Sequence, residues 1–145
     1  MFRHIFLIVL FLVFVIPLNA QNPTTEGVDF WVTFLYNYDE DPDELKLIVA
    51  GQNCQGVVTN PRTGYQKEFE VVAGDVTNVV VPAEECYTTS LGQPSFTALH
   101  ITTTDTVSLY ASNFKANTFD VTNVLPTPTL SDSYMLQTYA PGSGN

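Results

Sequence analysis

The sequence predicts an all-β protein, an antiparallel β-sandwich of the Ig-like or jelly-roll-like kind with little helix. Three observations lead to this fold class. Short runs of alternating apolar and polar residues recur along the chain, and turn-forming residues separate them about every 8–12 positions. No segment after residue 20 has a convincing helical period.

The strongest strand signal covers residues 30–35, where every residue except Thr33 is bulky and apolar. Alternation puts Trp31 on one face of this strand and Phe30 and Phe34 on the other. Apolar residues on both faces predict a strand that is covered on both sides. Phe30, Trp31 and Phe34 are therefore predicted core residues, and the alternative for Trp31 is a platform on which a sugar or an aromatic ligand stacks.

The remaining strands follow the same two-residue alternation. Turns are predicted at residues 60–64, where Pro61 and Gly64 occur, and at residues 73–75 and 103–105. Residues 84–94 read as a polar loop. The predicted strands cover residues 45–50, 55–59, 65–72, 76–81, 97–102, 107–111, 121–125 and 133–139.

The amino terminus has the features of a secretory signal peptide. Arg3 and His4 precede an apolar run over residues 5–16, and Ala20 ends the segment. The run is short for a membrane span, which needs about 20 residues, although an uncleaved anchor is the alternative. We therefore expect residues 1–20 to be a signal peptide and residues 21–140 to form one domain. Residues 141–145 read as a linker or a truncation point, and the chain is expected to be exported to the cell surface, the extracellular space or the periplasm.

Acidic composition excludes several partners. The formal net charge is −10, and removal of Arg3 with the signal peptide makes it more negative. Nucleic-acid binding needs a positive surface that neutralises phosphates, and binding to anionic lipid is disfavoured for the same reason. We expect neither partner, and no stable membrane insertion after cleavage. The basic residues left after residue 20 are Lys46, Arg62, Lys67 and Lys115.

The two cysteines, Cys54 and Cys86, are candidates for a disulfide because export permits oxidation. Two buried free thiols are the alternative. Their spacing matches neither a redox motif nor a zinc site.

Reactive centres are not indicated by the sequence. His100 is the only histidine after the signal peptide, and it alternates with apolar residues inside a predicted strand. Asp39, Asp41 and Asp43 have the spacing that begins a calcium loop, but Glu44 stands where an EF-hand needs glycine. A solvated acidic loop is the simpler interpretation. We predict no enzyme activity, no catalytic residue, no metal and no cofactor.

Three segments carry a resemblance to a known family. Residues 25–34 (TEGVDFWVTF) resemble the start of the IgGFc-binding protein N-terminal domain family, as found in exported bacterial proteins. Residues 107–113 (VSLYASN) resemble a strand that ends in asparagine, and residues 124–126 (VLP) begin a proline-leucine-tyrosine segment. The sequence departs from the family at Ser131 and Asp132, where a glycine is usual after the leucine. The resemblance implies a β-rich, non-enzymatic binding or adhesion region.

The leading hypothesis is an exported adhesion module that binds a host or matrix glycoprotein or a polysaccharide. The alternatives are a structural spacer within a larger surface protein and, less favoured, a secreted hydrolase. Clustering of exposed aromatic side chains such as Tyr36, Tyr38, Tyr87 and Tyr110 would favour recognition, and their dispersal would favour the spacer.

Overall fold

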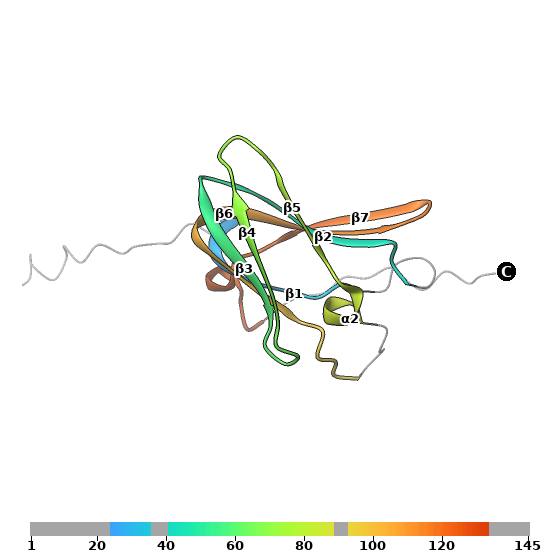
Figure 1. The fold of residues 1–145 in the computed structure, drawn as a ribbon. Coiled ribbons are helices and arrows are strands. Elements are labelled where there is room, and N and C mark those ends of the chain that lie inside the picture. The colour runs from blue at the N-terminus through green and yellow to red at the C-terminus, as the bar shows by residue number, and fades with distance from the viewer. Residues whose placement is uncertain (1–23, 36–40, 89–92, 134–145) are drawn as a thin grey trace, which may run out of the picture.

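The fold is an antiparallel β-sheet of seven strands, which confirms the all-β prediction (Figure 1). The structure is a computed structural model that describes residues 24–35, 41–88 and 93–133. Helix is confined, in this part of the chain, to one turn of α2 and one 3-10 turn, η1. The strands are β1 (Glu26–Val32), β2 (Glu44–Gly51), β3 (Cys54–Asn60), β4 (Tyr65–Val71), β5 (Thr77–Val81), β6 (Leu99–Lys115) and β7 (Thr118–Val124), with α2 at Ala83–Cys86 and η1 at Thr127–Thr129.

Strand β6 is the centre of the sheet, because four other strands pair with it. Its first part pairs with β1 on one side and β3 on the other, as in the matches of Ile101 with Phe30 and with Val58. Its second part pairs with β2 and β7, and Leu109 is matched there with Val49 and Val124. The backbone of β6 is thus hydrogen-bonded on both edges in both halves.

The sheet curls until it is nearly closed. The strand order along the main path is β4-β3-β6-β2-β5, so β4 and β5 are its two ends. These ends come together, since Lys67 Nζ donates to the Val80 carbonyl at 2.8 Å and Thr77 Oγ1 donates to the Glu70 carbonyl at 2.9 Å. The two layers expected of a sandwich therefore belong to one continuous sheet.

A bend inside β6 replaces a predicted turn. The sequence places a link at residues 103–105 between two short strands, whereas the structure has one strand of 17 residues. The pairing nevertheless jumps there: Asp29 of β1 matches Thr102, whereas Gly27, two residues earlier in β1, matches Val107. Thr103 Oγ1 donates to the Asp105 carbonyl at 2.8 Å, which holds the bend locally. The turn-forming residues change the direction of the strand without ending it.

Two other predicted turns are confirmed. Gly64 has φ +83° and Gly74 has φ +87°, the left-handed region that glycine adopts without steric cost. Gly64 N donates to the Asn60 carbonyl at 3.0 Å and closes the turn between β3 and β4. Asn60 is itself buried, and its side-chain amide donates to the carbonyls of Glu85 and Phe96.

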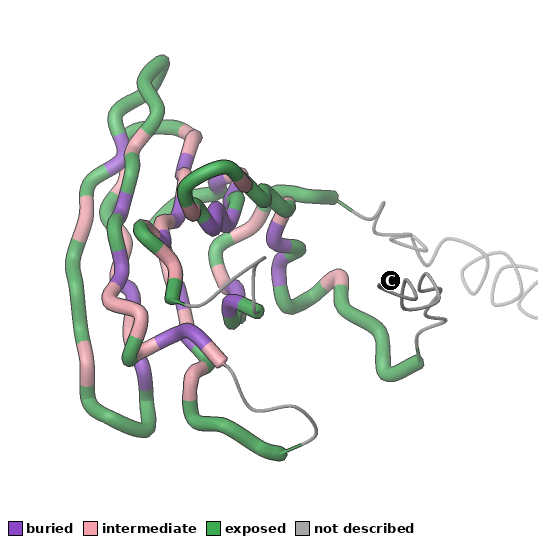
Figure 2. The backbone as a smooth tube through the Cα atoms, turned by 90° about the vertical axis from the view of Figure 1, so that its right-hand side faces the viewer, coloured by how far each residue is buried: buried purple, intermediate pink, exposed green. Residues whose placement is uncertain are grey.

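The core prediction is confirmed for Phe30 and Phe34 and is wrong for Trp31. Phe30 is fully buried and Phe34 nearly so, whereas 43% of the Trp31 surface is exposed. The reason is that neighbouring side chains point to opposite faces of the sheet: Phe30 is matched with the buried Ile101, and Trp31 is matched with His100 on the outer face. This outer face is open at Trp31. Figure 2 shows how buried and exposed positions alternate along the strands.

Several expectations concern residues that lie outside the described ranges. The signal peptide at residues 1–20, the segment at 141–145 and nearly all of the strand expected at 133–139 belong to this group. In the ranges that are described, no helix has the length and apolar character needed to cross a membrane.

Substitution at neighbouring positions of β1 separates the inner face from the outer face. Phe30→Ala should lower the free energy of unfolding by about 3–5 kcal/mol, because it leaves a cavity in the core. Trp31→Ala should cost less than half as much, since its ring stack contributes about 0.5–1.5 kcal/mol. Urea denaturation followed by far-UV circular dichroism measures both. Equal losses at the two positions would contradict the placement of Trp31 on an open face.

Candidate functional site

The outer face of one half of the sheet carries the most distinctive group of exposed side chains. Residues matched across antiparallel strands lie on the same face. Asp29 is matched with Thr102, Thr102 with Val57, and Val57 with Glu68, so one row crosses four strands. The next row begins with Trp31 matched with His100. We call this surface the polar face; it comprises Asp29, Trp31, Val57, Glu68, His100 and Thr102.

Trp31 is held flat against His100. Their ring centroids are 4.4 Å apart and their planes differ by 12°, which is a stacked arrangement. The two side chains come from directly opposite positions on β1 and β6, where cross-strand aromatic pairs stabilise a sheet. One side of the indole thus contacts the imidazole, and the exposed part of the ring can contact a ligand.

His100 is fixed in turn by Asp29. His100 Nε2 and Asp29 Oδ2 share a hydrogen bond of 2.9 Å, and Thr127 Oγ1 in η1 donates to Asp29 Oδ1. The hydrogen bond from Thr127, followed by that from His100, lowers the pKa of the Asp29 carboxyl below its ordinary value of 3.8. Asp29 therefore connects β1, β6 and η1 behind the exposed indole.

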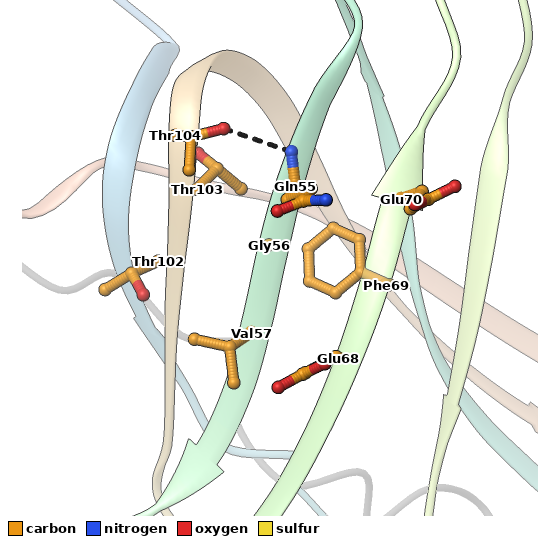
Figure 3. Close-up of a pocket in the computed structure, with 9 residues that line it drawn as sticks. All are labelled: Gln55, Gly56, Val57, Glu68, Phe69, Glu70, Thr102, Thr103 and Thr104. Atoms are coloured by element: carbon orange, nitrogen blue, oxygen red, sulfur yellow. Dashed lines mark hydrogen bonds between the residues drawn. The ribbon is translucent and has the colours of Figure 1, made fainter.

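A cleft of about 460 Å³ adjoins this group on β3, β4 and β6 (Figure 3). The row of Thr102, Val57 and Glu68 forms part of its wall. Gln55 and Glu70, which are matched with each other, form another part. The cleft thus presents two carboxylates, a side-chain amide and threonine hydroxyls.

Gly56 makes room for the ring of Phe69, a residue of the cleft lining whose side chain packs against the hydrophobic core. A Cβ atom on Gly56 would lie 2.2 Å from Cζ of Phe69, so no other residue fits without moving the ring. Figure 3 shows the Phe69 ring between β3 and β4, beside Gly56. Thr104 Oγ1 accepts a hydrogen bond of 3.0 Å from Gln55 N and ties the bend of β6 to the start of β3. These contacts give the cleft a fixed shape.

The predicted disulfide is wrong: Cys54 and Cys86 are both free thiols. Cys54 begins β3, whereas Cys86 lies in α2 near the far end of that strand, where Asn60 Nδ2 contacts the Glu85 carbonyl at 3.0 Å. Six steps of extended strand separate the two ends by roughly 20 Å, well beyond the reach of a disulfide. Burial, with smaller contributions from Glu84 and Glu85, raises the pKa of the Cys86 thiol to about 12.

One carboxylate of the acidic segment that was predicted to be a solvated loop makes structural contacts. Asp43 accepts a hydrogen bond of 2.7 Å from Ala116 N and pairs with Lys115 at 3.4 Å, while Asp39 lies outside the described residues. Within the ranges that the structure describes, no three His, Cys, Asp or Glu side chains are grouped so that they could hold a metal ion.

The tyrosines considered from the sequence do not form the site. Tyr87 is buried, and Tyr110 lies on the other half of the sheet, matched with Asn123 of β7. Tyr36 and Tyr38 are outside the described residues.

The side chains that sequence reasoning missed are those of the cleft. Alternation in residues 65–72 did predict that Glu68 and Glu70 face outward. It could not indicate that they lie in line with Thr102 and Asp29, because this alignment depends on the pairing register of three strand pairs.

No protein-family model, no curated protein and no solved structure matches this chain. The resemblance to the IgGFc-binding protein N-terminal domain family remains a prediction from three sequence segments.

Removal of the Asp29 carboxylate should change the pH dependence of stability. A carboxyl whose pKa is lowered by folding stabilises the protein above its unfolded value, here 3.8, and this contribution is lost as the pH falls through the folded value. Asp29→Asn should therefore be less stable than the parent at pH 6, and the difference should shrink below pH 4. Urea denaturation at both pH values measures this. Asp120→Asn on exposed β7 is the control, and a gap for Asp29→Asn that stays constant down to pH 3 would contradict the assignment.

Thiol titration should distinguish the two cysteines. In denaturant without reductant, two thiols should react with a chromogenic disulfide. In the native protein at pH 8, the half-buried Cys54 should react at least about 100-fold faster than Cys86, which is buried, protonated and reached only through local opening. Cys54→Ser should leave only the slow phase. A titration that finds no thiol in denaturant would show that the two sulfurs are joined.

Proposed function

We propose that this protein is an exported, non-enzymatic binding module whose ligand contacts the polar face. The observation that carries the proposal is an exposed tryptophan, held flat against His100, beside a cleft of about 460 Å³. Tryptophan is enriched among the residues that dominate binding energies. A cleft with a few convergent polar groups is the usual form of a ligand site.

The rigid support of the indole favours recognition. His100 stacks on it from behind, Asp29 holds His100, and Thr127 holds Asp29. A side chain that is already fixed in its binding orientation loses little conformational entropy when a ligand arrives. A chain of three interactions behind one exposed ring is more than packing alone requires.

The three segments that suggest the family come together in space, which supports the adhesion reading of that resemblance. β1 pairs with β6, and Asn113 Nδ2 in β6 donates to the Leu35 carbonyl at 3.0 Å just after β1. Pro126 forms an isolated bridge with Phe30. A signal peptide at residues 1–20 would deliver such a module to the cell surface or beyond, where glycoproteins and polysaccharides are available as ligands.

The hydrogen-bond partners of Thr127 and His100 favour binding over hydrolysis. The hydroxyl of Thr127 donates to Asp29, and the hydrogen bond of His100 goes to that same carboxylate. A nucleophilic triad would instead place the hydroxyl against the imidazole. The arrangement in this protein suits the positioning of Trp31.

A structural spacer is the second candidate, because the other half of the sheet has an apolar outer face. Phe114 and Phe119 pack edge to face with centroids 6.3 Å apart, and 57% of the Phe119 surface is exposed. Tyr110 and Val121 are exposed on neighbouring positions. Exposed apolar surface of this kind marks contact with another protein or domain.

Intrinsic fluorescence tests the binding proposal directly, because Trp31 is the only tryptophan in the chain. Titration with mucin, glycan or immunoglobulin panels should shift its emission for at least one ligand at micromolar concentration. Trp31→Ala should weaken binding about tenfold or more, as measured by calorimetry.

Phe119→Ala is the matched control, because it removes an exposed aromatic ring outside the polar face. It should bind as the parent does. Loss of an interaction with Phe119→Ala but not with Trp31→Ala would favour the spacer. No heat and no spectral change with any panel member would refute the binding proposal.

A further inference from the structure

The polar face is long in the direction that crosses the strands. Trp31 lies on β1 at one edge and Glu68 on β4 at the other, with β6 and β3 between them. Three strand spacings of about 4.8 Å give a width of roughly 14 Å. A ligand that touches both ends must be extended, and a single small ring would not reach.

The chemistry changes along this direction. At the β1 edge the exposed group is the flat indole of Trp31, which contacts apolar surface and offers one N–H donor. In the cleft, the carboxylates of Glu68 and Glu70 only accept hydrogen bonds, while Gln55 and the threonine hydroxyls can donate and accept. A matching ligand has a flat C–H face at one end and several hydroxyl donors at the other.

The charge of the cleft restricts the ligand further. Neither Glu68 nor Glu70 forms an ion pair within the described residues, whose ion pairs are confined to Lys46, His100 and Lys115. The lysine directly before Glu68, Lys67, reaches across to the Val80 carbonyl at 2.8 Å. The cleft is therefore negative, and like charges placed together at an interface disfavour association.

We infer that the polar face binds a neutral oligosaccharide that lies across the strands, stacked on Trp31 at one end and hydrogen-bonded to Glu68 and Glu70 at the other. This inference rests on the proposed binding function and specifies its ligand class. The ring faces of sugars are apolar and their rims carry hydroxyl donors, which is the combination that the two ends require. Uronates, sialylated glycans and sulfated glycans are excluded by charge.

A cationic peptide would also satisfy two carboxylates, but its charged side chains fit the rest of the cleft less well. Lysine and arginine side chains only donate hydrogen bonds, so they leave the donors of Gln55 and of the threonine hydroxyls unused. The hydroxyls of a sugar donate and accept at these positions.

The test compares the affinities of the full-length protein for neutral and for acidic oligosaccharides. Cellotriose, mannotriose and triacetylchitotriose are titrated by fluorescence and calorimetry, together with C6-oxidised cellotriose, sialyllactose and oligolysine. At least one neutral trisaccharide should bind about tenfold or more tightly than every acidic probe. Trp31→Ala should weaken the neutral complex about tenfold, and Phe119→Ala should leave it unchanged.

The double variant Glu68→Gln, Glu70→Gln keeps the size of both side chains and removes their charge. It should weaken the neutral complex and narrow the gap between neutral and acidic forms, and its unchanged circular dichroism would show that it folds.

Several outcomes would overturn the inference. Tighter binding of an acidic probe or of oligolysine would do so, and so would a neutral complex that is indifferent to both Trp31→Ala and the glutamine variant. Binding to immunoglobulin or deglycosylated mucin alone would overturn the ligand class but leave the binding function standing. Failure of every probe to bind would refute both the ligand class and the binding function. Release of shorter sugars would keep the ligand class and refute the non-enzymatic role.

Discussion

The structure depends on the backbone of β6, a strand of 17 residues whose segments before and after the bend are paired on both edges. None of the other strands in residues 24–35, 41–88 and 93–133 is long enough to satisfy one edge. β1 and β7 divide one side, and β3 and β2 divide the other. The chain is therefore obliged to return to β6 four times, and the order of its strands follows from that requirement.

The bend at residues 103–106 of β6 turns this arrangement into two different surfaces. Before the bend, the inner row of Phe30, Ile101 and Val58 is buried, and the outer row carries Trp31 and His100. After it, the inner row again supplies the core, but the outer row is apolar, with Phe114 opposite Phe119. One core thus supports a polar face and an apolar face. The bend separates them without a second domain.

Much of this fold could be predicted from local patterns, and the failures have physical causes. Alternation located β2, β4 and β5 to within two residues, and Gly64 and Gly74 marked real turns. The strands at 97–102 and 107–111 are predicted as separate because Thr103 to Asp105 has turn-forming composition, whereas pairing of β6 before and after the bend keeps the chain in one strand. Trp31 is predicted in the core because its neighbours are apolar, whereas it lies on the outer face of the sheet and is exposed there. The disulfide prediction is wrong because the spacing of the two cysteines in the sequence does not show that the extended strand β3 holds them apart.

Local sequence patterns could not predict the candidate site, because the pairing register of the strands decides which side chains lie together. A shift of one residue in the pairing of β1 with β6 would move Trp31 to the inner face and Phe30 to the outer face. The core forbids this shift, since Phe30 packs among Ile101 and Val58 in a space that a tryptophan or an aspartate could not fill without strain or an unpaired charge. Burial of Phe30 is thus what holds the indole outward and keeps Asp29 in line with Thr102 and Glu68. The arrangement of the polar face is thus maintained by residues of the core.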